Sequence, residues 1–179
     1  MKKNWMLIAI LAILVLNTVC LFNLFTSKPK LAYVKSQELV YGYMGMKEAE
    51  TKFDIRSKKM LSSVDSLKYE LQRAIQDFNT QAETINPEIL QKQREKLRIQ
   101  EMNIQKYEDN IQDKLIAEES EMLEGILNQI NSFVEQYAKE KNYQYIFGTT
   151  TAGNLLYADD TEDITQEVLE HLNKNYSDS

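Results

Sequence analysis

The sequence is poor in the side chains on which most enzymes rely. It contains one cysteine, Cys20, and one histidine, His171. These counts exclude zinc sites made of cysteine and histidine, and any Cys/His or Ser/His/Asp nucleophile would need His171. That histidine lies near the C-terminus within a helical pattern, which is typical of a surface residue. There is no glycine-rich phosphate loop and no recognisable carboxylate pair, so we expect no enzyme, metal or cofactor.

Turn-forming residues are also scarce, with five glycines and two prolines in the whole chain. This is too few for an all-β domain and favours long helices. The composition is 43% hydrophobic and 27% charged, which is not that of a disordered chain. We therefore expect an α+β protein that is mostly α.

Positive charge is in the minority. The formal net charge is −6, and it becomes −8 when Lys2 and Lys3 are set aside. A body of this sign does not bind nucleic acid through its phosphates, so we expect no nucleic-acid partner.

Residues 1–27 have the character of an export segment. Lys2 and Lys3 precede a largely apolar stretch at residues 5–25, which is long enough to cross a bilayer with its positive end in the cytoplasm. Three interpretations stay open: an uncleaved signal anchor in the inner membrane, a cleaved signal peptide, and a lipoprotein attached at Cys20. The lack of an A-x-A-like cleavage site favours the anchor.

Residues 46–141 are almost free of helix breakers except at Asn86-Pro87. On both sides of this point, apolar or small residues recur at steps of three and four, which predicts a coiled-coil seam. The first half of the seam consists of Phe53, Ser57, Met60, Val64, Leu67, Leu71, Ala74, Phe78, Ala82 and Ile85. The second half consists of Leu90, Leu97, Ile104, Tyr107, Ile111, Leu115, Met122, Ile126, Phe133 and Tyr137, with Gln93, Gln100 and Glu118 at intervening seam positions.

Asn86 is a suitable N-cap and Pro87 suits the first turn of a second helix. The simplest arrangement is an antiparallel hairpin of two long helices with its tip near residues 86–87. A single rod kinked at Pro87 is the alternative. We favour the hairpin because the segments at its two ends have the character of strands that pair with each other.

The two ends are expected to form one small β platform from residues 28–45 and 142–179. Residues 31–35 and 143–147 have strand composition, and residues 155–158 follow a turn-rich cluster, which predicts a β-hairpin and a three-stranded sheet.

A final helix is predicted at residues 164–173. Asp163 precedes it as the N-cap, and Ile164, Val168 and Leu172 form its apolar stripe.

So thin a sheet has exposed edges that further copies of the chain would cover, so we expect a homo-oligomer. A ligand pocket among its aromatic side chains is the less favoured alternative. The expected oligomer platform consists of Tyr33, Val34, Tyr145, Ile146, Phe147, Leu155, Leu156 and Tyr157.

Three segments carry a resemblance to a known family. They are Ala32-Tyr33-Val34 followed by Ser36 and Leu39-Val40, then Tyr145-Ile146-Phe147 with Leu156-Tyr157, and last Asp163-Ile164-Thr165 followed by Val168-Leu169. Over residues 31–176 the chain resembles the Skp/OmpH family of periplasmic chaperones. The resemblance implies a homotrimer whose β body holds three helical arms around a cavity, where unfolded outer-membrane or envelope proteins are held without ATP.

No individual client-binding residue is predicted, because the contacts are expected to be diffuse along the arms. Adaptable contacts are expected from the methionines Met44, Met46, Met60, Met102 and Met122, although methionine in a seam is more often part of the core. Well-known members of the family are basic, whereas this body is acidic, which puts their electrostatic aid and lipid binding in doubt. The expected location is the periplasm, with a tether to the inner membrane through residues 5–25 if these are retained. The alternative function is a membrane-anchored coiled-coil adaptor of the cell envelope.

Overall fold

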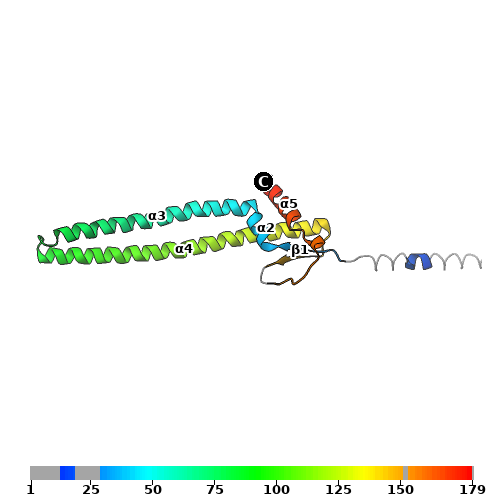
Figure 1. Cartoon of the computed structure of the whole chain (residues 1–179), viewed down its shortest axis with the longest axis horizontal. Coiled ribbons are helices and arrows are strands. Elements are labelled where there is room, and N and C mark those ends of the chain that lie inside the picture. Colours follow the sequence, from blue (N-terminus) through cyan, green and yellow to red (C-terminus); the bar gives the residue numbers. More distant parts are fainter. Residues whose placement is uncertain (1–12, 19–28, 151–152, 179) are drawn as a thin grey trace, which may run out of the picture.

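The computed structural model describes residues 13–18, 29–150 and 153–178. Two long helices lie side by side and end in a small base, as Figure 1 shows. The elements are β1 (Leu31–Lys35), α2 (Ser36–Gly42), α3 (Met44–Gln81), α4 (Pro87–Lys141), β2 (Tyr145–Thr149), the short 3-10 helix η1 (Asp160–Glu162) and α5 (Thr165–Ser177).

Of the expected export segment, the structure describes only residues 13–18, which are helical. The rest of that segment, including Lys2, Lys3 and Cys20, lies outside the described residues. Among the described parts of the chain, no helix has the length and apolar character needed to span a bilayer.

The helices α3 and α4 form the predicted antiparallel hairpin, so the prediction of a doubled-back chain is confirmed. Asn86 caps α4, since its side-chain oxygen accepts a hydrogen bond from the Glu88 N–H at 2.9 Å, and Pro87 occupies the first turn. With 55 residues, α4 is about 80 Å long at 1.5 Å per residue. The seam lies between the two helices and includes the buried side chains of Val64, Leu71, Ile104 and Ile111.

A left-handed residue ends α4 and turns the chain into the sheet. Asn142 has φ 58°, a conformation that asparagine tolerates better than most residues do. The next N–H, that of Tyr143, bonds back to the carbonyl of Ala138 at 2.9 Å. The Gln144 N–H then donates to the carbonyl of Lys30 at 2.9 Å, which starts the pairing with β1.

The sheet has two parallel strands, with Leu31 paired to Tyr145 and Lys35 paired to Thr149. The other edge of β1 is covered by the start of α5. There, the Ile164 N–H donates to the carbonyl of Tyr33 at 3.0 Å, and the Lys35 N–H donates to the Thr165 hydroxyl at 2.9 Å. No described strand pairs with the outer edge of β2.

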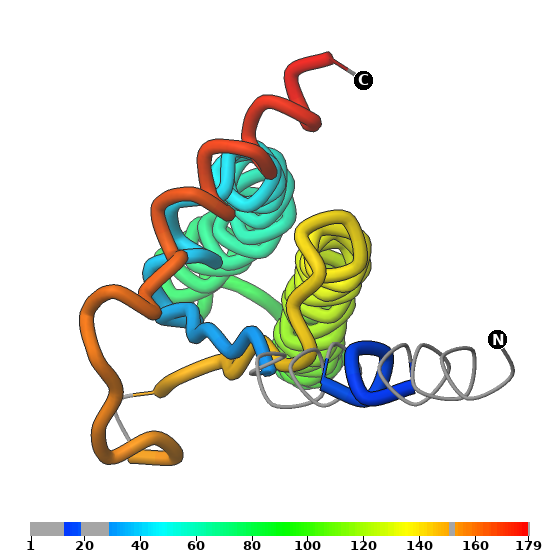
Figure 2. Tube along the Cα trace, turned by 90° about the vertical axis from the view of Figure 1, so that its right-hand side faces the viewer, coloured from blue at the N-terminus to red at the C-terminus, as the bar shows by residue number. Residues whose placement is uncertain are grey.

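The prediction of a three-stranded sheet with a β-hairpin was wrong. Residues 153–158 form no strand, and they lie to one side of the arms (Figure 2). Asn154 bonds to the end of β2 through its side chain instead. It accepts from the Thr150 N–H at 3.0 Å and donates to the Gly148 carbonyl at 2.6 Å. Residues 155–158 therefore find no neighbouring strand to pair with among the described residues of the single chain.

The core of the base forms where α5 crosses α2, α3 and α4. As predicted, the stripe of Ile164, Val168 and Leu172 is buried, and Val168 is fully enclosed. Asn173 bonds to both sides of the break between α2 and α3. Its oxygen accepts from the Met44 N–H at 2.7 Å, and its amide donates to the Gly42 carbonyl at 3.2 Å. These contacts fix α5 on the root of the arms.

Two glycines allow this close packing. A Cβ on Gly42 would lie 2.5 Å from a methyl carbon of Leu169, and a Cβ on Gly45 would lie 2.5 Å from the ring of Tyr43. The Tyr43 ring is buried, meets Tyr176 edge to face at 5.5 Å, and donates its hydroxyl to Gln129 of α4 at 2.9 Å. The break between α2 and α3 is thus anchored to the second arm.

Candidate interaction surfaces

The parallel register separates the expected platform residues into two faces. Paired residues of parallel strands point to the same side, so Ala32, Val34 and Ile146 face the core. Of the predicted platform residues, Val34 is buried and Ile146 is partly buried against the core. Neither offers a free surface to a partner.

The opposite face of the sheet is apolar and open. It consists of Leu31, Tyr33, Tyr145 and Phe147, which we call the sheet patch. Tyr145 and Phe147 are 60% and 48% exposed, and their rings stack at 6.0 Å. Large aromatic side chains in such a setting are typical of protein–protein contacts. The sheet patch therefore brings together three of the residues singled out from the sequence.

The remaining platform residues lie on the loop after β2. Leu155 is partly buried, whereas Leu156 and Tyr157 are 94% and 84% exposed. Side chains of this size gain nothing from such exposure. Their placement suits a contact that the single chain does not supply.

Along the arms, exposed apolar side chains occur on both helices, outside the seam for the most part. They are Ile55, Leu61, Tyr69, Ile75, Ile89, Ile99, Met102, Tyr107, Ile116, Leu123 and Leu127. Among the methionines expected to give adaptable contacts, Met44 and Met102 are exposed, whereas Met46 belongs to the core. Tyr107, assigned to the seam from its spacing, is 39% exposed. The arms therefore present scattered apolar contacts and no single deep site.

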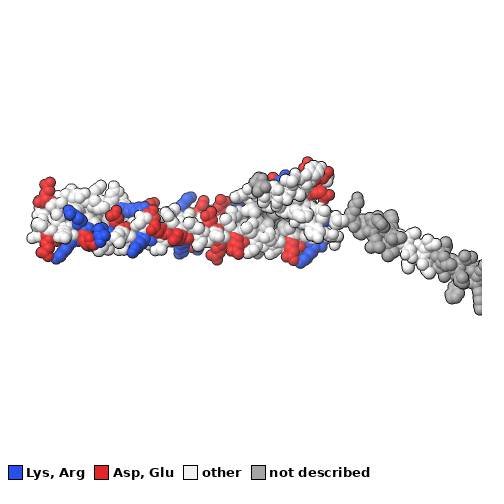
Figure 3. All heavy atoms as spheres, turned by 90° about the horizontal axis from the view of Figure 1, so that it is seen from below, with Lys and Arg blue, Asp and Glu red and all other residues white. Residues whose placement is uncertain are grey.

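Charged side chains of both signs are spread along the arms (Figure 3). Two ion pairs join α3 to α4: Arg56 with Glu118 at 3.2 Å, and Lys68 with Glu108 at 2.6 Å. In each pair the cation is largely exposed and the carboxylate is mostly enclosed, so solvent still screens the attraction, and each pair contributes on the order of 1 kcal/mol. They link the two arms at the edge of the seam.

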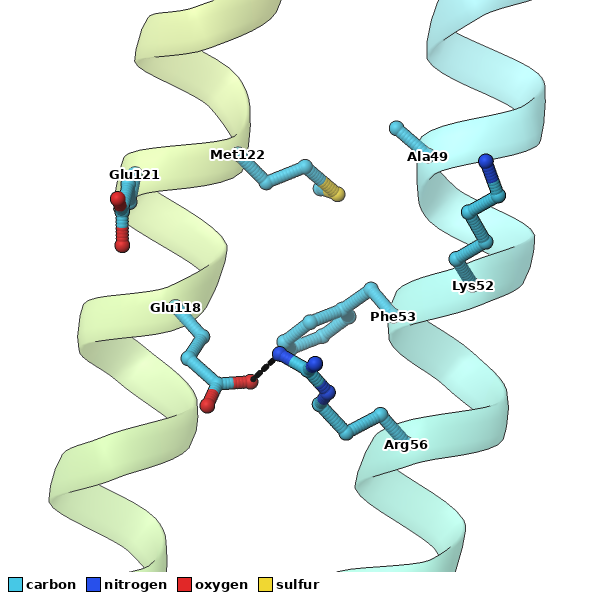
Figure 4. A pocket seen from close by; sticks show the side chains of 7 residues that line it. All are labelled: Ala49, Lys52, Phe53, Arg56, Glu118, Glu121 and Met122. Atoms are coloured by element: carbon cyan, nitrogen blue, oxygen red, sulfur yellow. Dashed lines mark hydrogen bonds and ion pairs between the residues drawn. The ribbon is translucent and has the colours of Figure 1, made fainter.

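Near the base, the arms enclose an open recess of about 590 Å³. Phe53 of α3 and Met122 of α4 project into it from opposite sides, and the Arg56–Glu118 pair crosses one end (Figure 4). Ala49 leaves room for this recess. Its lining combines apolar side chains with charged ones of both signs, and it contains no cysteine, serine or histidine.

Aromatic rings fill the junction between α4 and α5. Tyr137 stacks between Phe133 and Tyr143, and the exposed His171 meets its edge at 5.6 Å. Burial raises the pKa of the Tyr137 phenol, and the nearby Glu167 carboxylate adds to the rise. This hydroxyl therefore stays protonated at neutral pH, which suits packing and not proton transfer.

Sequence reasoning missed the helix α2 and the buried role of Tyr43. The available signal for α2 is weak, because Ser36 is already helical and the N-cap residue, Lys35, forms no side-chain capping bond. The acidic Glu38 in the first turn is the one feature that favours a helix start. No local pattern predicts that Tyr43 reaches Gln129, since that contact depends on how the arms fold back.

Comparison with solved structures supports the fold. A crystal structure of a Caulobacter crescentus protein, described as an OmpH-like outer membrane chaperone, matches with a TM-score of 0.74. The identity is 15%, and the match covers 83% of this chain and 86% of that protein. A search of curated proteins found no match.

A family model gives the decisive comparison. The model for outer membrane proteins of the OmpH-like type matches residues 30–172, which include both strands, both arms and most of α5. This is well over half of the chain. The chain therefore belongs to the OmpH-like family.

Proposed function

We propose that this protein is an ATP-independent holdase chaperone and not an enzyme. It binds unfolded envelope proteins, including those destined for the outer membrane, between the coiled-coil arms of a homo-oligomer. Membership of the OmpH-like family and the likeness to a protein described as an outer membrane chaperone support the chaperone role.

The observation that carries the proposal is the set of exposed apolar side chains spread along α3 and α4. A holdase must prevent aggregation yet release its client without a fuel. Many weak contacts meet this need better than one pocket, because each contact breaks at little cost while their sum lowers the free concentration of the client. The absence of a deep pocket on the described arms fits such binding.

The oligomer is expected to assemble through the base. The sheet patch, the outer edge of β2 and the exposed loop residues Leu156 and Tyr157 support an interface between copies. The expected number of three copies comes from the family resemblance. Such a base would hold the arms of each copy around a shared space.

The periplasm is the proposed location. The family and the export character of residues 1–27 support it. If residues 5–25 stay in the mature protein, the arms would work close to the inner membrane, where clients emerge.

An aggregation assay tests the proposal. A urea-unfolded β-barrel protein is diluted into buffer with the full chain, and light scattering is recorded. We expect the full chain to suppress scattering at a stoichiometric amount of trimer. A variant with Ile89→Ser, Ile99→Ser and Met102→Ser should need at least about threefold more protein for the same effect, because it loses three apolar contacts.

The control variant changes three exposed polar residues of the same helix, Gln91→Ser, Lys96→Ser and Asn103→Ser, and should match the parent. Unchanged scattering with the parent protein would refute the holdase. A stable partner that co-purifies at a fixed ratio with rigid arms would instead identify an adaptor.

A further inference from the structure

The helix α4 carries a second apolar stripe that α3 does not cover. Ile116, Leu123 and Leu127 are all exposed, and their spacing of seven and four residues places them on one face. Each follows a residue of the seam by one position, so the stripe is turned about 100° away from α3. It therefore lies beside the arm-to-arm contact and is distinct from it.

The stripe continues from the core of the base into solvent. The next positions on the same face, three and then four residues further along, are Ile130, which is buried, and Val134, which packs against the core. From Leu127 toward the tip, the same face has no covering element among the described residues. Apolar side chains at this spacing are typical of a helix face that receives a partner.

Carboxylates border the stripe. By helical geometry, Asp113 and Glu124 lie along one side and Glu119 along the other. All three are exposed, and none forms an ion pair with another described residue. By contrast, Glu118 is paired with Arg56 on the other side of the helix. The apolar stripe is thus bordered by a negative rim whose carboxylates form no ion pair with the described cations.

We propose that this face, defined by Ile116, Leu123 and Leu127 with Asp113, Glu119 and Glu124, docks cationic amphipathic segments of unfolded proteins. In such segments, lysine or arginine flanks the apolar side chains. This inference rests on the proposed holdase function and specifies its preferred clients.

Charge complementarity decides between possible occupants. A basic segment brings its apolar residues onto the stripe while its cations meet the rim, which speeds capture and favours this partner over acidic ones. A second copy of α4 would bring the same carboxylates face to face, and like charges in contact are repelled. The rim therefore selects a cationic client over self-association.

Two synthetic peptides of about two heptads test the inference. They share their apolar positions, and the remaining positions are lysine in one and glutamate in the other. Binding to the full chain is measured by fluorescence anisotropy. At low salt, the lysine peptide should bind at least about tenfold more tightly, and the difference should shrink at about 1 M salt, where charges are screened.

Matched variants locate the binding face. Ile116→Ala should weaken binding of the lysine peptide about threefold, whereas Ile55→Ala should leave its affinity unchanged, although both side chains are 66% exposed. The variant with Asp113→Asn, Glu119→Gln and Glu124→Gln should weaken it about tenfold. A control variant changes the net charge by the same amount through three exposed carboxylates of α3, with Glu50→Gln, Asp54→Asn and Glu70→Gln. Its affinity for the lysine peptide should fall by at most about twofold.

Equal affinity for the two peptides, or equal losses in the two charge variants, would overturn the inference. It is also overturned if the Ile116→Ala variant changes the sedimenting mass of the protein and leaves peptide binding intact, because the stripe would then join copies of the chain. Client aggregation is followed with the same samples. Suppressed aggregation without a peptide preference refutes this inference alone, whereas unsuppressed aggregation refutes the holdase itself.

Discussion

At the scale of single residues, Asp163 joins the start of α5 to the sheet. One carboxylate oxygen accepts from the Thr165 N–H at 2.9 Å and from the Thr165 hydroxyl. The other lies 3.0 Å from the Lys35 ammonium of β1. Partial burial raises the pKa of Asp163, but the bonds from Thr165 and Lys35 outweigh it and hold the pKa below its usual value. The helix begins at Thr165 with Ile164 as its N-cap residue, one position later than predicted, so Asp163 caps the first N–H of α5 from the preceding position and also forms an electrostatic link to β1.

Acid should weaken this link. Because the pKa of Asp163 is lower in the folded chain than in the unfolded chain, its stabilisation is complete above the unfolded pKa of about 4 and is lost as the pH falls through the folded pKa. Asp163→Ala should lower the free energy of unfolding by about 1 to 2 kcal/mol at pH 7, mainly through the lost cap. Urea unfolding between pH 7 and pH 2 measures both effects.

The matching control is Asp163→Asn, which keeps a capping oxygen and removes the titration. It should be intermediate in stability at pH 7, with a flatter pH profile below pH 5 than the parent. A parent profile as flat as that of Asp163→Asn would contradict the role assigned to the carboxylate.

At the scale of elements, the arms combine a regular seam with polar interruptions. Glu118 occupies a seam position between Leu115 and Met122, and its side chain is mostly enclosed while it pairs with Arg56. A carboxylate at such a place gives less stability than an apolar side chain, because it keeps water near the seam. The recess near the base lies beside this interruption.

Glu118→Leu should make the apolar seam between α3 and α4 continuous at this position. We expect the free energy of unfolding to rise by about 1 kcal/mol, since a leucine side chain would replace a charged one in the seam. Hydrogen exchange should slow on the facing turns, residues 51–60 and 114–123. Lys58→Leu adds the same side chain to an exposed position of α3 and should change neither quantity. Equal protection in both variants would show that the seam at Glu118 is already closed.

Local chemistry explains which elements could be predicted. The arms follow from a long seam and the Asn86-Pro87 cap, and α5 follows from a short stripe and from Asp163, which bonds to its first N–H. The segment 155–158 has strand composition, yet whether it becomes a strand depends on an edge that its own chain does not supply. The same limit applies to the interaction surfaces. Burial of Val34 and exposure of Phe147 depend on the parallel register, which no local pattern reveals.

At the scale of the whole molecule, the base is the expected point of assembly. Its sheet has two strands, and a sheet of this size is marginal without further covering. The stacked rings of Tyr145 and Phe147 stand at its open face. Their burial between copies would add apolar contacts on the face of the sheet that the single chain leaves open.

Tyr145→Asp together with Phe147→Asp should therefore separate the copies. We expect the dissociation constant of the oligomer to rise at least about 30-fold, which corresponds to about 2 kcal/mol for an aromatic contact. Analytical ultracentrifugation at micromolar concentration measures the mass, and circular dichroism checks that the helices persist. Tyr69→Asp, at an equally exposed position of α3, should leave the mass unchanged. A parent protein that sediments as a monomer would contradict the assembly.

The pairing of β1 with β2 also constrains how this architecture can change in length. Val34 and Thr149 lie 115 residues apart in the chain and share a hydrogen bond, so the sheet fastens together the two ends of the hairpin. An insertion in α3 alone would shift either the seam or the strand register. We therefore expect length changes to occur in matched steps, one on each helix, which would lengthen or shorten the arms and leave the base unaltered.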